Sequence, residues 1–116
     1  MDSKQINITV AKLAGWKIEV RKDPTAGETA SCFFVIKPDG EIRGIAIGDS
    51  ELQAAGLVPN FCKDWSIMQS TATIIINNKP LAFMNRLNNN LKDFNPLYDT
   101  PETFWTLFLK SLDKID

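Results

Sequence analysis

The spacing of apolar residues changes near Gly15, from a helical period to a two-residue period. Over residues 2–14 the apolar positions recur at steps of three and four, which is typical of one buried helix face. Asp2 or Ser3 supplies the N-terminal cap, and Gly15 suits the left-handed conformation that ends a helix. Over residues 16–21 apolar and charged residues alternate, so the pattern predicts a helix followed directly by a strand with one face in water.

Two apolar runs, over residues 31–37 and 41–47, flank a Pro-Asp-Gly turn sequence. The pair Asp39-Gly40 between such runs is a strong signal for a β-hairpin. The first run is apolar on both faces, and such strands lie in sheets that are covered on both sides. We therefore predict a three-stranded, mainly antiparallel sheet with helices on each face.

The second half of the chain carries the pattern of three further helices. Asp64 is a candidate cap for a stripe that continues to residue 76. The β-branched run Ile74–Ile76 also suits a strand, but the spacing of the whole stripe favours a helix. A second helix is predicted over residues 80–91, where proline occupies the first turn. Thr100, followed by proline and glutamate, begins a third that continues to residue 116.

The predicted elements combine into one α+β domain over residues 1–116. We expect a three-layer α/β/α sandwich with a three-stranded, mainly antiparallel sheet and three to four helices. Residues 48–56 form a short connection with room for one helical turn. The composition, 44% hydrophobic and 23% charged, is that of an ordinary globular protein.

Charge and hydropathy restrict the partners and the compartment. The net charge of −1, from 13 basic and 14 acidic residues, disfavours nucleic acid and an anionic membrane surface as partners. No apolar run approaches the ~20 residues that a membrane helix needs. The N-terminus does not resemble a signal peptide, and two cysteines are no disulfide framework. We therefore expect a cytoplasmic protein.

The side chains that most often carry catalysis are scarce. The chain has no histidine, so a Ser-His-Asp or Cys-His arrangement cannot be built from it. Cys32 and Cys62 are widely spaced and do not resemble a zinc site. Cys62 precedes a predicted helix and could be a reactive nucleophile, but packing as a small apolar residue is favoured. We expect no enzyme activity, no catalytic residues, no metal and no cofactor.

Two groups of residues are candidates for binding. Arg21, Arg43 and the aromatic ring of Phe61 could converge on a small, nucleotide-like ligand. The last helix is apolar around more than half its circumference, so it is either buried on two sides or part of an oligomer interface. For the second alternative we hypothesise a homodimer with Trp105 and Leu109 at its centre.

Three short motifs resemble a known family. Residues 11–16 read AKLAGW, residues 58–65 read VPNFCKDW, and residues 100–102 read TPE. In this order they resemble the small phage and prophage proteins of the phage ABA sandwich domain family. Many of those proteins have serine or threonine where Cys62 and Lys63 stand here, and residues 27–51 are this chain's own.

The resemblance implies a three-layer fold and a context, but no catalytic residues. The context is a small accessory protein of a phage or an integrated element in a bacterial cytoplasm. The first functional hypothesis is a non-enzymatic module that binds a host or phage macromolecule. The alternative is a protein that binds or sequesters a small, nucleotide-like molecule, and an enzyme that uses carboxylates alone is a third.

Overall fold

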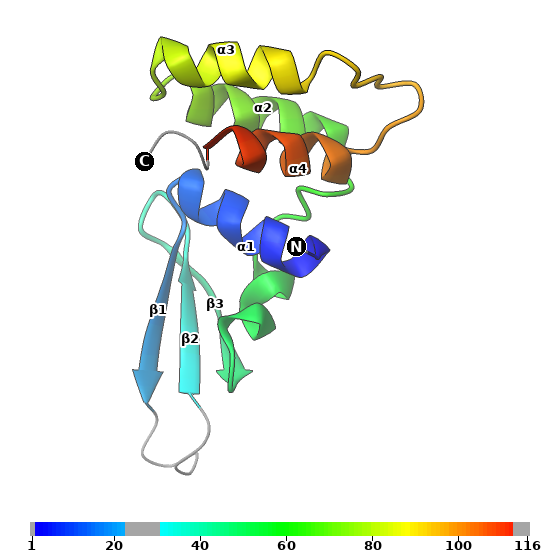
Figure 1. The fold of residues 1–116 in the computed structure, drawn as a ribbon. Coiled ribbons are helices and arrows are strands. Elements are labelled where there is room, and N and C mark those ends of the chain that lie inside the picture. The colour runs from blue at the N-terminus through cyan, green and yellow to red at the C-terminus, as the bar shows by residue number, and fades with distance from the viewer. Residues whose placement is uncertain (1, 23–30, 113–116) are drawn as a thin grey trace. The chain divides into compact units, whose positions relative to one another are not determined.

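The computed structural model describes residues 2–22 and 31–112, and it is α+β with a three-stranded antiparallel sheet (Figure 1). The chain divides into two compact units, Asp2–Asn60 and the residues from Phe61 onward. The sequence predicts one domain, and each of these units is described by itself. The elements are α1 (Ser3–Leu13), β1 (Lys17–Lys22), β2 (Ser31–Ile36), β3 (Ile42–Gly48), the 3-10 helix η1 (Glu51–Leu57), α2 (Trp65–Ile76), α3 (Leu81–Asn90) and α4 (Pro101–Leu112).

Helix α1 begins and ends where the capping chemistry predicts. The backbone amide of Gln5 donates to Asp2 Oδ1 over 2.9 Å, and the amide of Asp2 donates to Gln5 Oε1 over 3.1 Å. This reciprocal pair is a capping box, which satisfies two amides that the first helical turn leaves without partners. Gly15 has φ +100°, a conformation that other residues rarely adopt, and it turns the chain from α1 into β1.

The sheet has the order β1-β2-β3, and both neighbouring pairs are antiparallel. The predicted Asp39-Gly40 turn joins β2 to β3 and is confirmed. The amide of Lys37 donates to the carbonyl of Glu41 over 2.8 Å, and Asp39 Oδ1 accepts from the amide of Glu41 over 2.8 Å. Gly40 supplies the positive φ of +92° that the turn requires.

One face of the sheet is covered from within its own unit. Val35 is buried on this face, and register places Gly44 beside it on β3. A Cβ at Gly44 would lie 3.0 Å from the side chain of Leu57, so glycine lets η1 pack directly against β3. The described residues of this unit thus provide one helix layer, and the second helix layer of the predicted sandwich stays a prediction.

The second unit consists of α2, α3 and α4 around an aromatic core. The Asp64 side chain accepts from the amide of Ile67 over 3.0 Å, which confirms the predicted cap of α2. Ile74–Ile76 lie within α2, so the helical alternative is the correct one. The core rings meet edge to face or tilted at centroid distances of 5.1–6.2 Å; they are Phe61, Phe83, Phe104, Trp105 and Phe108.

Candidate interaction surfaces

The interface predicted around Trp105 and Leu109 is wrong, because both side chains lie in the core. Trp105 is 0% exposed, and its indole N–H donates to the backbone carbonyl of Phe61 over 3.1 Å. Its ring also packs edge to face against Phe104 and Phe108. Leu109 is buried as well. Helix α4 is therefore apolar around much of its circumference because it is buried on more than one side.

The three candidate ligand-binding residues do not form the predicted site. Phe61 is 1% exposed, so its ring is core and is not presented to a ligand. Arg21 on β1 pairs in register with Cys32, near the start of β2. Arg43 lies at the β-bulge beside Ile36, near the end of β2. The two arginines thus stand on strands that flank β2 and near its opposite ends, so the register does not bring them side by side.

Arg21 instead has local partners that explain its position. Its guanidinium lies 4.2 Å from the centroid of the Phe34 ring, which is a cation–π distance. Its Nη2 also donates to Glu19 Oε2 over 2.9 Å, on the same strand. All three residues share the sheet face opposite η1, since Glu19 pairs with Phe34 and Arg21 pairs with Cys32 in the register. Arg21 therefore covers part of an apolar sheet surface with its charged group in water.

The cysteines have the packing role that the sequence favours. Cys62 is 5% exposed, and burial, with a smaller contribution from the negative charge of Glu102, raises the pKa of its thiol to about 11. A thiol with such a pKa is protonated near neutral pH, and the protonated thiol is a poor nucleophile. Cys32 is buried too. Within residues 2–22 and 31–112, no three His, Cys, Asp or Glu side chains are grouped closely enough to hold a metal ion.

The face of the sheet opposite η1, here called the open sheet face, carries isoleucines that remain half-exposed. Ile45 is paired with Phe34 of β2, and Ile47 is paired with Cys32. Ile45 is 51% exposed and Ile47 is 62% exposed. Ile42, on the other side of the bulge, is 53% exposed. Ile45 and Ile47 are neighbours on this face, and a group of exposed apolar side chains is more informative than a single one, because it is typical of an interaction site.

A second apolar surface lies in the loop between α3 and α4, here called the Asn95 loop (residues 94–99). The amides of Tyr98 and Asp99 both donate to the carbonyl of Asn95, over 3.0 and 2.8 Å. The Asn95 side chain accepts from the amide of Leu97 over 2.9 Å, and Asp99 Oδ2 accepts from the amide of Asn95 over 2.8 Å. Four hydrogen bonds thus close the loop on itself.

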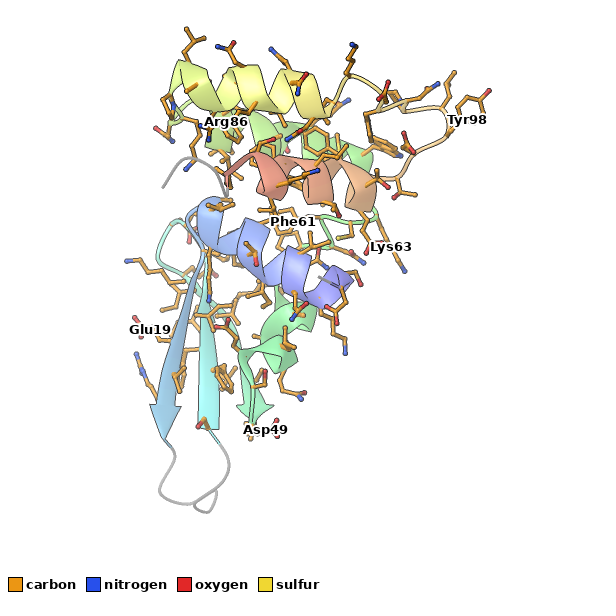
Figure 2. The ribbon with its side chains drawn as sticks, in the orientation of Figure 1. Glu19, Asp49, Phe61, Lys63, Arg86 and Tyr98 are labelled. Carbon is orange, nitrogen blue, oxygen red and sulfur yellow. The ribbon has the colours of Figure 1, made fainter. Side chains whose placement is uncertain are left out.

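The Asn95 loop is anchored at one end and exposed at its tip. The ring of Phe94 lies 6.1 Å from Trp65 and 5.9 Å from Phe104, centroid to centroid, which holds the start of the loop on the helices. Leu97 and Tyr98 are 85% and 84% exposed, and Tyr98 points away from the helices (Figure 2). The loop therefore presents two adjacent apolar side chains on a braced backbone.

The break between the helices predicted over residues 80–91 and from Thr100 implies a loop here, but it does not reveal the two exposed residues. The signal that could have found them is an adjacent Leu-Tyr pair directly after Asn95-Pro96, outside any helical stripe. Apolar residues that no element can bury are candidates for binding a partner. No known protein family, curated protein or solved structure matches the chain. Among the described residues, no helix is both long and apolar enough to span a bilayer.

Proposed function

We propose that this chain is a non-enzymatic module that binds a partner protein through Leu97 and Tyr98 of the Asn95 loop. The carrying observation is that these two neighbours are the most exposed of the large apolar side chains described, on a loop closed by its own hydrogen bonds. Tyrosine is enriched among the residues that dominate binding energy, since its ring buries apolar area while its hydroxyl keeps a hydrogen bond.

The bracing of the loop supports this role energetically. A loop that is already ordered loses little conformational entropy when a partner covers it, so more of the contact energy appears as affinity. The ring of Phe94 between Trp65 and Phe104 adds to this order from the helix side. The partner surface that fits Leu97 and Tyr98 is an apolar pocket with a polar rim, because both side chains project fully from the chain.

The lack of histidine and of an exposed thiol supports binding rather than catalysis. The chain lacks histidine, and its two thiols are buried, one of them with a pKa near 11. No observation favours the small-molecule alternative, because Phe61 is a core residue and the two arginines flank β2 near its opposite ends. On the motifs at residues 11–16 and 58–65 we further propose a phage or prophage accessory role, with a bacterial cytoplasmic protein as the partner.

The test is a comparison of binding by three forms of the full chain. The wild-type chain would be used to capture partners from a lysate of the cells that encode it. An identified partner would then be purified and titrated against each form by calorimetry. We expect the double variant L97A/Y98A to weaken binding at least ~30-fold, the effect of losing one strong interface anchor worth ~2 kcal/mol. Leu81 is 74% exposed in the same unit, so L81A is the matched control and should bind like the wild type.

Each outcome of the titration bears on the role of the loop. A purified partner that binds wild type and L97A/Y98A with equal affinity would refute that role. Equal weakening by L81A would show a general effect of lost apolar surface. A thermal-shift screen with nucleotides tests the small-molecule alternative, because a ligand at 100 times its Kd stabilises the folded chain by ~2.7 kcal/mol. A rise in melting temperature that corresponds to this stabilisation would support the small-molecule alternative instead.

A further inference from the structure

Strand β3 contains a segment whose sequence reads the same in both directions. Residues 44–48 are Gly-Ile-Ala-Ile-Gly, with Ala46 at the centre. When such a strand pairs antiparallel with a copy of itself about Ala46, Ile45 lies opposite Ile47 of the copy. Gly44 then lies opposite Gly48 of the copy, so large residues face large ones and small residues face small ones. The segment is therefore self-complementary in both size and sheet face.

The two edges of the sheet differ in how they are protected. In the order β1-β2-β3, both β1 and β3 are edge strands. The exposed residues of β1 include Lys17, Glu19 and Arg21, and charged side chains on an edge discourage pairing with another strand. In β3 the sole charged residue is Arg43, at the bulge, and none follows it in the segment 44–48. Residues 44–48 of β3 thus lack the charged side chains that protect the β1 edge.

The small residues and the large residues of this segment have different roles in the fold. Gly44 and Gly48 face the chain's own η1, because added Cβ atoms would lie 3.0 Å from the Leu57 side chain and 2.5 Å from the Gln53 side chain. Ile45 and Ile47 lie on the opposite face and remain more than half exposed. The described residues of their unit leave these two isoleucines half-exposed, whereas a second strand placed beside them would cover their outer sides.

We infer that β3 pairs with β3 of a second copy of this chain, antiparallel and centred on Ala46. The two three-stranded sheets become one six-stranded sheet with a twofold axis at its middle. Cross-strand neighbours in such a ladder have Cβ atoms ~5 Å apart, so each Ile45 packs against Ile47 of the copy. The strand that pairs with β3 is β3 of a second copy, because the palindromic order makes this segment complementary to itself. Closed twofold dimers are also the commonest symmetric assemblies.

This dimer is independent of the proposed function, which rests on Leu97 and Tyr98. It also replaces the surface that the sequence predicts for self-association, since Trp105 and Leu109 lie in the core. β3 belongs to the unit Asp2–Asn60, whereas the Asn95 loop belongs to the unit from Phe61 onward, so the two proposals rest on different residues of different units. Failure of one proposal therefore leaves the other intact.

The experiment measures the mass of the full chain by light scattering and analytical ultracentrifugation over a concentration series. The wild type should show a concentration-dependent dimer. The variant I45K/I47K places lysine opposite lysine across the proposed axis, and we expect the dimer Kd to rise at least ~10-fold. The variant I45E/I47K places opposite charges in both cross-strand pairs, so the dimer should return. Circular dichroism confirms that each variant is folded.

A matched control separates edge pairing from packing of the sheet faces. Ile42 has nearly the same exposure as Ile45 and lies on the same strand, but the bulge separates it from the palindromic segment. I42K should therefore leave the dimer Kd unchanged. A wild-type chain that is monomeric at its highest soluble concentration overturns the inference. Disruption of the dimer by I42K also overturns the inference, because it indicates face-to-face packing. The inference is likewise overturned if I45E/I47K remains as weakly dimeric as I45K/I47K.

Discussion

Replacing Trp105 by phenylalanine is the perturbation whose cost is best determined by the structure. The change keeps an aromatic ring in the core but removes the indole N–H that donates to the carbonyl of Phe61 over 3.1 Å. That carbonyl belongs to a residue that is 1% exposed, so water does not readily replace the lost donor. A buried acceptor left without its partner costs ~1–3 kcal/mol.

The smaller ring adds a packing cost. Trp105 is 0% exposed and touches the rings of Phe61, Phe104 and Phe108, so the missing ring atoms leave a void rather than a solvent-filled notch. A void on the order of 40 Å³ costs ~1 kcal/mol at ~24 cal/mol per Å³. The expected loss in the free energy of unfolding for W105F, the sum of these two costs, is therefore ~2–4 kcal/mol.

Urea unfolding followed by far-ultraviolet circular dichroism measures this loss. With an m value of ~2 kcal/mol/M, the midpoint of W105F should fall by about 1–2 M urea. Trp65 is only partly buried, so W65F in the same unit is the control and should lose ~1 kcal/mol or less. A W105F midpoint within the range of W65F, at unchanged m, would refute the view that the indole of Trp105 stabilises the aromatic core through its hydrogen bond and its packing.

Three further outcomes follow from caps, turns and the buried thiol. D64A removes the acceptor of the Ile67 amide and should cost ~1 kcal/mol in thermal unfolding, whereas D64N, which keeps an acceptor, should cost much less. G15A forces alanine into φ +100° and should destabilise the folded chain by ~1 kcal/mol or more. G56A is the control and should be close to neutral, because an added Cβ there meets nothing within 4 Å. Equal losses of stability in the two variants would contradict the role of Gly15 in the turn. Because burial raises the Cys62 pKa from 9.0 to about 11, the unfolded thiol ionises first, so stability is retained below pH 9 and lost as the pH rises toward 11. C62A should lack this component of the alkaline decline, and parallel pH profiles of the two proteins would argue against a shifted pKa.

Local chemistry determined most of the secondary structure. The caps at Asp2 and Asp64, the left-handed Gly15 and the Asp39-Gly40 turn act over a few residues, so their neighbours in the sequence suffice to predict them. The antiparallel order of the three strands follows from the same short-range signals. The predicted bounds differ from the observed ones by a residue or two at the described helix and strand ends.

Tertiary packing decided which apolar residues are buried and which are left for a partner. Periodicity shows that Trp105 and Ile45 are apolar members of an element, but burial depends on what packs against each face. The aromatic rings of the helical unit enclose Trp105, whereas η1 covers the face of β3 that carries glycines and leaves Ile45 outside. Likewise, the hydrogen bonds that close the Asn95 loop are local, but the exposure of Leu97 and Tyr98 depends on which elements pack against the loop, and this becomes definite only in the folded chain.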